Sequence, residues 1–279
     1  MGLLGTSLGL ALKHHRLADK IIGVGRVGSP SLQIALQRGA IDVARTDPAA
    51  AAPSDLIVLA TNIAVFPEIF RAIANGLAEQ TIITDVGSTK QQVCRWAKDL
   101  LPAPACFVGS HPMAGSEKRG PEFARPDLYT NAACFICAGK APRLEVAAQR
   151  VEWMWQQLGM RTLRIKPHAH DRWVAAISHT PHAAAAALVN LIGPDAANLL
   201  RAAAGGFMDT TRVASGDVAM WTDIFLTNRR AASQSIRALV QLLQGFERAI
   251  RHEDQATVRQ FLQQAKTIRD QLPPRQASG

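Results

Sequence analysis

The alternation of short β-rich runs with helical stretches in the first half of the chain is the feature that most restricts its fold. Strands that alternate with helices predict a parallel α/β sheet. From about residue 166 the β-branched runs stop, and Ala-, Leu-, Gln- and Arg-rich helical patterns continue to two prolines at residues 273–274. The runs that we interpret as strands are residues 20–24, 56–60, 81–85, 106–108 and 133–138.

The change near residue 166 predicts two domains. A chain of 279 residues fits two cores of ordinary domain size better than one. We assign residues 1–165 to an α/β domain and residues 166–279 to an all-α domain, with residues 273–279 as a disordered tail. Because the helical half has more apolar surface than a monomer covers easily, we expect a homodimer that forms through it.

Composition and charge argue against several classes of protein. The chain has 48% hydrophobic and 19% charged residues, as soluble globular proteins do. Its apolar runs are far shorter than the roughly 20 residues of a membrane-spanning helix, and we find no secretory signal pattern. We therefore expect a cytoplasmic protein without a membrane anchor. The net charge of +9 comes from dispersed Lys and Arg residues, which favours an anionic small substrate over nucleic acid.

The four cysteines are too few and too scattered for a disulfide scaffold, so we expect them to be reduced and buried. Cys134 and Cys137 form a C-x-x-C pattern within an apolar run that reads as a strand. A spacing of three places their side chains on opposite faces of that strand. We interpret them as core residues rather than as a redox or metal pair.

The first eight residues, MGLLGTSL, match the last part of a G-x-G-x-x-G motif that runs into an amphipathic helix. In a Rossmann-type fold these glycines let the backbone approach a pyrophosphate at a helix N-terminus. We therefore expect a nicotinamide dinucleotide to contact Gly2, Leu3, Leu4 and Gly5.

The same motif requires a first strand directly before its glycine turn, and the sequence has no residues for that strand. The strand is central in the usual order, so two neighbours would keep unpaired backbone groups without it. We expect the natural reading frame to begin upstream with a short Val/Ile-rich run that ends in glycine. Otherwise the chain should be unstable and bind cofactor poorly.

The end of the run at residues 20–24 bears on the choice of cofactor. A carboxylate at this point would accept the ribose hydroxyls of NAD, but the sequence has Gly25 and Arg26. A small residue followed by arginine leaves room and charge for a 2′-phosphate, which favours NADP. The alternative is that Arg26 is a solvated surface residue and NAD binds without a side-chain acid.

Three polar motifs follow the strands or open the helical half: DVGSTK at residues 85–90, GSHPMAGSE at 109–117 and SHTPH at 178–182. Together with GGFMDTTR at 205–212 and MWTDIF at 220–225, they resemble the prephenate and arogenate dehydrogenase family. The resemblance covers nearly the whole chain. It implies a Rossmann domain followed by a helical dimerisation domain, and an NAD(P)-dependent oxidative decarboxylation in tyrosine biosynthesis.

The resemblance assigns catalytic roles to His111 and Ser88. The family's substrate is a cyclohexadienol with a carboxylate on a quaternary ring carbon. As hydride leaves the carbinol carbon, the hydroxyl proton needs a base and the ring carboxylate departs as carbon dioxide. By resemblance His111 is that base, on a loop at the carboxyl edge of the sheet, and Ser88 hydrogen-bonds the site near the nicotinamide.

The resemblance also implies contacts to substrate and cofactor. Arg212 resembles the arginine that fixes a substrate carboxylate, a role that suits a planar bidentate donor. His182 would border the substrate pocket, and Glu117 would favour the ammonium group of arogenate unless it is only a surface or capping residue. Met208 stands where many relatives have a second arginine, so any ion pair made there is absent. The other assignments are Ser116 and Trp221 for the substrate, and Thr61, Asp85 and Gly87 for the cofactor.

Three histidines of the helical half, His170, His179 and His182, could suggest a metal site. At about 100° per residue, His179 and His182 share a helix face while His170 points away from them. We therefore expect no metal, with His170 and His179 orienting helices and loops, and a helix kink at Pro181.

Two other functions fit parts of the sequence. One is a two-domain dehydrogenase of the β-hydroxyacid or pyrroline-carboxylate reductase kind, which lacks this histidine motif. The other is a non-catalytic NAD(P)-sensing protein, although the presence of His111, Ser88 and Arg212 together speaks against it. The residues do not decide between prephenate and arogenate.

Overall fold

The computed structural model describes residues 1–103, 105–115, 118–193 and 196–272. The tail expected at residues 273–279, and the expected substrate residues Ser116 and Glu117, lie outside the described residues. The chain forms two compact units, Met1–Ala232 and Ser233–Gly279, whose residues contact mainly other residues of the same unit.

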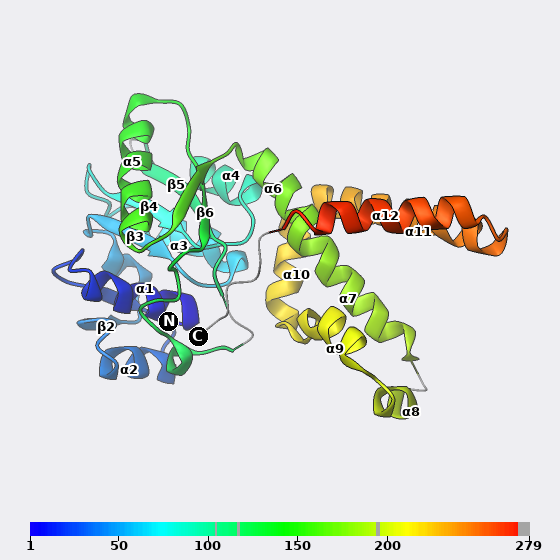
Figure 1. The fold of residues 1–279 in the computed structure, drawn as a ribbon. Helices are drawn as coiled ribbons and strands as arrows, with labels where there is room; N and C mark the ends of the chain where they lie inside the picture. Colours follow the sequence, from blue (N-terminus) through cyan, green and yellow to red (C-terminus); the bar gives the residue numbers. More distant parts are fainter. Residues whose placement is uncertain (104, 116–117, 194–195, 273–279) are drawn as a thin grey trace. The chain divides into compact units, whose positions relative to one another are not determined.

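The strands of the first unit form two sheets (Figure 1). The smaller sheet pairs β1 with β2 in parallel. The larger sheet has the order β3-β4-β5-β6-β7, with β3, β4 and β5 parallel. Strand β6 is antiparallel to β5 and parallel to β7, so the sheet is mixed at this end. The bounds are β1 Ile22–Val24, β2 Val43–Arg45, β3 Leu56–Leu59, β4 Ile82–Asp85, β5 Cys106–Pro112, β6 Ala133–Cys137 and β7 Arg161–Arg164.

The two sheets are separate, and the division falls between β1 and β3. In the usual Rossmann order the first strand of the fold lies between these two strands. That strand is not among the described residues. The remaining architecture is the predicted one, a Rossmann-type sheet followed by helices.

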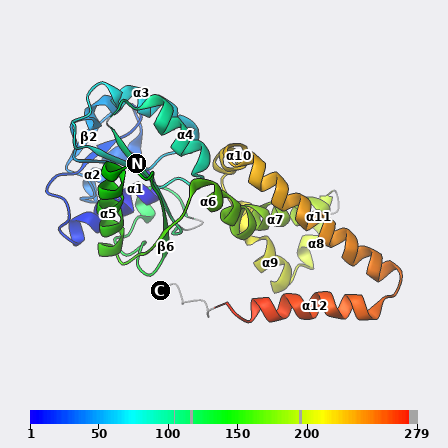
Figure 2. The same ribbon diagram turned by 90° about the horizontal axis from the view of Figure 1, so that it is seen from above.

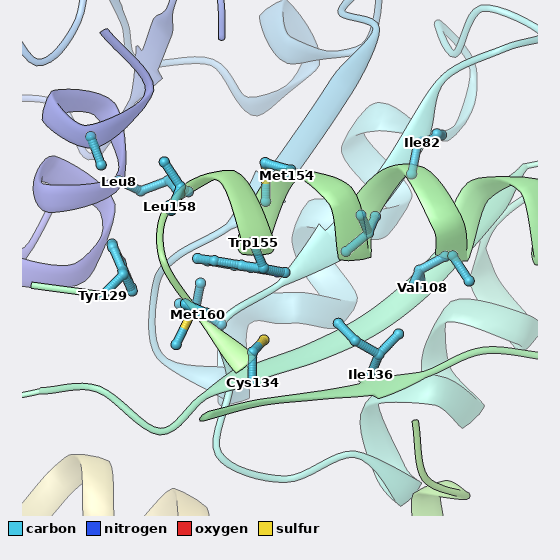
Figure 3. Packing of buried hydrophobic residues seen from close by; sticks show 14 of the residues in the cluster. Leu8, Ile82, Val108, Tyr129, Cys134, Ile136, Met154, Trp155, Leu158 and Met160 are labelled. Carbon is cyan, nitrogen blue, oxygen red and sulfur yellow. The ribbon is translucent and has the colours of Figure 1, made fainter. Parts of the chain in front are cut away.

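Helices cover both faces of the larger sheet, and neighbouring residues of one strand serve the two sides. Ile82 of β4 belongs to a core with α1 and α5, whereas Ile83 packs with α3 and α4 (Figure 2). Figure 3 shows Trp155 of α5 in the first of these cores, among Tyr129, Cys134 and Met160. The helices of this part are α1 Leu3–His14, α2 Pro30–Gln37, α3 Phe66–Ala74, α4 Gln91–Leu100 and α5 Pro142–Gln157.

The cysteines are free, and three of them are buried while Cys94 is partly buried. Burial raises the pKa of the Cys94 thiol to about 12. The three buried cysteines are core residues, as the sequence predicts. Cys94 is a poor nucleophile and a poor metal ligand, because its thiol stays protonated.

The helical part of the first unit begins with α6, Pro167–Val174, and changes to a π-helical turn over Ala175–His179 before α7 starts at Thr180. Pro181 lacks the N–H that would continue the regular helix. The irregular turn therefore lies where the sequence predicts a break, and such π turns recur at functional sites. The following helices are α7 Thr180–Leu191, α8 Ala196–Arg201, α9 Gly205–Thr211 and α10 Val218–Thr227.

Helix α11, Arg229–Arg251, runs from the first unit into the second, where α12, Gln255–Arg269, follows it. The rings of Phe246 and Phe261 stack with their centroids 4.5 Å apart, and the Asp254 side chain caps α12 by accepting a hydrogen bond from the Thr257 N–H. Leu242 and Leu243 of α11 are more than half exposed. Among the described residues, no helix combines the length and the apolar character needed to cross a membrane.

Candidate active site

A buried ion pair shapes the turn after β4. The Asp85 carboxylate and the Lys90 ammonium have no exposed surface and bind each other. The carboxylate also accepts hydrogen bonds from the N–H groups of Gly87, at 2.9 Å, and Ser110, at 3.0 Å. Burial raises the pKa of Asp85, and Lys90 and the two N–H groups oppose that rise.

This burial corrects the expected role of Asp85. Its side chain has no surface to offer a cofactor, so its role is to hold the turn rather than to contact a ligand. Gly87 is needed there because an added Cβ would lie 2.8 Å from the Asp85 Oδ2 and 3.1 Å from Ile63 Cγ1. Ser88 is partly buried in this turn, and the next residue, Thr89, hydrogen-bonds Thr227 of α10 at 3.0 Å.

His111 lies within strand β5 rather than on the loop that the sequence predicts. β5 continues past its parallel pairing with β4 and pairs with antiparallel β6, so that His111 stands opposite Phe135. Only 8% of His111 is exposed. A strand pairing fixes its backbone more firmly than a loop would, because the ladder constrains every residue in it.

A chain of hydrogen bonds leads from His111 into the helical part. Its Nδ1 lies 2.9 Å from Nε2 of His170, and Nδ1 of His170 lies 2.8 Å from Oδ1 of Asp171. Both partners come from α6 and are fully or almost fully buried. The SHTPH motif contributes no residue to this series of hydrogen bonds, because His170 and Asp171 precede the motif in the sequence.

Asp171 is itself held by the N-terminus of α4. Its two oxygens accept the N–H groups of Lys90, at 2.8 Å, and Gln91, at 3.0 Å. A carboxylate is favoured there, because a helix N-terminus presents free N–H groups and the positive end of the dipole. The amide of Asn228 donates to the Asp171 carbonyl oxygen at 2.8 Å and contacts Nδ1 of His179 at 3.2 Å.

Electrostatics keep these histidines neutral. Burial lowers the pKa of His111 well below 6.5, and His170, Lys90 and His179 lower it further. Burial also lowers the pKa of His170, against the opposing effect of Asp171. A neutral imidazole has one nitrogen that accepts a proton. Among the described residues, none hydrogen-bonds Nε2 of His111.

A second group of side chains surrounds His182 on α7. Its ring stacks on that of Trp221 with centroids 3.6 Å apart and an interplanar angle of 14°. Its Nδ1 is buried and has no hydrogen-bond partner among the described residues. His179 contacts Trp221 and Phe225 as well, which confirms that His179 and His182 share a helix face.

The remaining substrate residue, Arg212, is exposed in a short 3-10 helix, Arg212–Ser215, that packs against α7. Close by in sequence, Asp217 caps α10 and forms an ion pair with Arg119. Arg119 belongs to the segment after β5, so this ion pair connects the segment that follows His111 with the helical part. No group of His, Cys, Asp or Glu that could hold a metal is found among the described residues.

The first turn of α1 is open at Gly2. Gly2 caps the helix without a side-chain hydrogen bond, and the first turn contains no acidic residue. Nothing lies within 4 Å of the position that a Cβ on Gly2 would take, so the N–H groups of Leu3 and Leu4 are approachable. A Cβ on Gly5 would lie 3.1 Å from the Ala60 Cβ. Gly5 therefore allows close packing of α1 on the end of β3, as the third glycine of the motif should.

Three other expected cofactor residues lie after the ends of β1 and β3. Arg26 and Thr61 are exposed, and Gly25 packs closely on Leu32. The Arg26 guanidinium is near enough to the start of α1 to help lower the pKa of the Met1 α-amino group, after the larger effect of burial.

The residues of the segment after β5 that hydrogen-bond α1 belong to none of the sequence motifs. The Tyr129 hydroxyl donates to the Leu4 carbonyl oxygen at 2.7 Å, and the Arg125 N–H donates to the Ser7 hydroxyl at 3.1 Å. The Arg38 guanidinium donates to the carbonyl oxygens of Pro121, Glu122 and Ala124. These are contacts across large sequence separations, and no local pattern reveals them.

A mostly parallel α/β sheet with a glycine at the N-terminus of its first helix, followed by helices that contact a buried histidine of the sheet, is the architecture of two-domain nicotinamide dehydrogenases. The prephenate dehydrogenase nucleotide-binding domain matches residues 8–163, and the prephenate dehydrogenase dimerization domain matches residues 166–264. The chain belongs to the prephenate dehydrogenase family.

Characterised relatives support this membership along the whole chain. The prephenate dehydrogenase of Bacillus subtilis is 33% identical over 99% of this chain and 75% of its own length. The crystal structure of the A. aeolicus prephenate dehydrogenase with hydroxyphenyl propionate and NAD+ is 28% identical, with a TM-score of 0.89 over 98% of this chain and 96% of that one. A Synechocystis arogenate dehydrogenase structure is 29% identical, with a TM-score of 0.79 over 96% of each chain.

Proposed function

We propose that this protein oxidises prephenate or arogenate with NAD(P)+, releasing carbon dioxide, in tyrosine biosynthesis. The names of the relatives support this reaction over those of the other two-domain dehydrogenases. The observation that carries the proposal is His111, a buried neutral imidazole whose Nδ1 is engaged by His170. Such a group can accept a proton at Nε2 in a site from which water is largely excluded.

A nicotinamide held in this site would supply the acceptor for the hydride of the carbinol carbon. His111 takes the hydroxyl proton through Nε2, and the electrons of the departing ring carboxylate complete the aromatic ring. Ser88, in the turn after β4, hydrogen-bonds the reacting region. Catalysis is thereby assigned to His111 and Ser88.

The substrate is held mainly by the helical part. Arg212 binds a carboxylate of the substrate through its planar guanidinium. His182 and Trp221, whose rings stack, form one wall of the substrate site. Ser116 and Glu117 are assigned to the same site by resemblance alone.

The first turn of α1 and the ends of β1, β3 and β4 would hold the cofactor, and we expect NADP to be preferred. The exposed Arg26, next to Gly25 at the end of β1, suits a 2′-phosphate. The full set of proposed contacts is Gly2, Leu3, Leu4, Gly5, Gly25, Arg26, Thr61 and Gly87.

Residues 1–165 form the nucleotide-binding domain in this proposal, and residues 166–279 form the helical domain through which two chains dimerise. The name of the matched helical family and the exposed leucines of α11 support the dimer. Tyrosine biosynthesis would place the protein in the cytoplasm.

The test is a spectrophotometric assay that crosses prephenate and arogenate with NAD+ and NADP+. We expect reduced cofactor to appear with at least one substrate, faster or at lower concentration with NADP+, together with release of carbon dioxide. Cofactor binding without turnover of either substrate would contradict the proposed reaction and favour a sensing protein. Turnover with a clear preference for NAD+ would contradict only the cofactor assignment.

A further inference from the structure

We propose that His170 and Asp171 are positioning residues that fix the tautomer of His111 and take over its second proton during the reaction. This inference rests on the proposed function, because it assigns His111 the task of a base. It deepens that function by naming the groups that make His111 basic at the correct nitrogen.

The hydrogen-bond donors and acceptors of His111, His170 and Asp171 can be assigned by starting from Asp171. Asp171 is acceptor-only when ionised, and its oxygens already accept two N–H groups of α4. Nδ1 of His170 must therefore be the donor in its 2.8 Å contact with Asp171. A neutral His170 then has its lone pair on Nε2.

The protonation state of His170 determines that of His111. Because Nε2 of His170 is an acceptor, Nδ1 of His111 carries the hydrogen in the 2.9 Å contact between the two rings. The lone pair of His111 is left on Nε2. The carboxylate of Asp171 thus determines, through His170, which nitrogen of His111 can receive a proton.

His170 can also take the positive charge that forms when His111 accepts a proton. When Nε2 of His111 takes the hydroxyl proton, its Nδ1 proton moves to Nε2 of His170. His111 is then neutral again, and His170 becomes an imidazolium that donates from Nδ1 to the carboxylate of Asp171. One proton enters at His111, one proton shifts between the rings, and the number of protons is conserved.

Local charges favour this final arrangement. The pKa of His111 is lowered by burial and by nearby Lys90, so a lasting charge on its ring is unfavourable. Burial and Lys90 lower the pKa of His170 as well, but His170 alone of the two rings contacts a carboxylate, which opposes that lowering. That carboxylate is fixed by the N-terminus of α4 and cannot turn away without losing two hydrogen bonds.

The first test observes the tautomers directly in the resting protein. Nitrogen-15 NMR of histidine-labelled protein distinguishes a protonated ring nitrogen from one with a lone pair, with His111→Asn assigning the signals. We expect His111 and His170 both to be protonated at Nδ1 in the parent. A His111 ring protonated at Nε2 would overturn the proposal.

The second test replaces His170, the middle residue of the hydrogen-bonded series His111–His170–Asp171. His170→Phe preserves a ring but removes the acceptor, so kcat should fall on the order of 10²-fold or more, with KM within threefold and the Nδ1–H signal of His111 lost. His170→Gln supplies an amide oxygen for His111 and an NH₂ group for Asp171, so it should restore the Nδ1–H signal and part of kcat. The matched control is His168→Phe, an exposed histidine on the same helix, which should leave both readouts unchanged.

Two kinetic results would overturn the positioning role: a kcat of His170→Phe within threefold of the parent, or equal kcat for the Phe and Gln variants at equal melting temperature. If His170→Phe does not fold, the Gln variant and the NMR of the parent still decide. If the parent oxidises neither prephenate nor arogenate, the proposed function fails, whereas the NMR result stands independently of the substrate.

Discussion

The two sides of the site are built in different ways. On the proposed cofactor side, the contacts would come from backbone N–H groups of α1, from glycines that leave space, and from the exposed side chains of Arg26 and Thr61. On the proton-transfer side, His111, His170 and Asp171 are buried and joined by side-chain hydrogen bonds.

This difference predicts different responses to substitution. A backbone site tolerates most exchanges of exposed side chains, because its donors do not depend on residue type, so changes there adjust affinity in small steps. A buried network of polar side chains depends on every member, since one missing partner leaves another group unsatisfied in a low-dielectric environment. Substitutions on that side should therefore have the largest effects.

The largest effect on catalysis is expected for His111→Asn. The amide can still donate to His170 but offers no basic nitrogen, so kcat should fall roughly 10²–10⁴-fold while the affinity for cofactor stays nearly unchanged. Stopped-flow or steady-state assays with separate cofactor titrations measure both quantities. An unchanged kcat would refute the assignment of the base.

Lys90→Met should have the largest effect on stability. It leaves the buried Asp85 carboxylate without its counter-ion, which costs roughly 3–5 kcal/mol in the free energy of unfolding. Urea unfolding measures the loss. Lys98→Met, an exposed lysine of the helix α4 that follows Lys90, is the control and is expected within about 0.5 kcal/mol of the parent.

The loss in Lys90→Met should depend on pH in a defined direction. Burial raises the pKa of Asp85, and removing Lys90 removes the main opposing effect. Between the unfolded and the raised folded pKa the native state binds the extra proton, so its stability rises as pH falls. A deficit that grows as the pH is lowered would contradict a buried, uncompensated carboxylate.

Arg212→Ala should act on substrate binding alone. Loss of a bidentate carboxylate contact should raise KM by an amount equivalent to about 2–4 kcal/mol, with cofactor binding intact. Arg201→Ala, another exposed arginine of the helical part, is the control. A KM for Arg212→Ala within twofold of the parent would remove Arg212 from the substrate site.

Arg26→Ala tests the cofactor side, where effects should be smaller. It should weaken NADP binding by about tenfold, which is about 1.4 kcal/mol, and leave NAD nearly unaffected. Arg45→Ala is the matched control, because Arg45 is exposed at the end of the neighbouring strand β2. Equal losses for both cofactors would indicate a defect in folding instead.

The smallest effect is expected when the pH is lowered towards 6.5, because His111 stays neutral and kcat/KM should not fall on its account. Because the pKa of His111 lies well below 6.5, its neutral form persists as pH falls through that value. The kcat/KM profile should therefore show no loss from this base near pH 6.5 and should decline only at lower pH. A decline centred at 6.5 or above, absent from His111→Asn, would contradict the lowered pKa.

The strands with apolar patterns could be predicted from sequence, and the two without them could not. Each predicted run overlaps an observed strand, whereas β7, with the sequence RTLR and mostly exposed side chains, carries no apolar pattern. β2 is only three residues long and is also poorly buried. The extension of β5 through His111 was missed because its ladder partner is antiparallel β6, and pairing between distant segments leaves no local pattern.

For the site, motifs pointed to residues but not to their connections. His111, His182 and Trp221 could be named from sequence, yet the roles of His170 and Asp171 depend on α6 meeting β5 and the start of α4. Asp85 shows the opposite error, because its place in a polar motif suggested a ligand contact and the structure buries it completely. Burial and distance are properties of the folded chain, and they decide which polar residues of a motif face a ligand.

Because Asp171 caps α4, the parts of the active site are completed in a definite order as the protein is synthesised. The residues that set the tautomer of His111 follow it by about sixty positions in the chain, and they reach it only when α6 docks on α4. A growing chain on the ribosome would hold His111 long before it holds Asp171. The glycine turn and the base are thus made early, but a correctly protonated base exists only after the helical part has been synthesised and has packed in place.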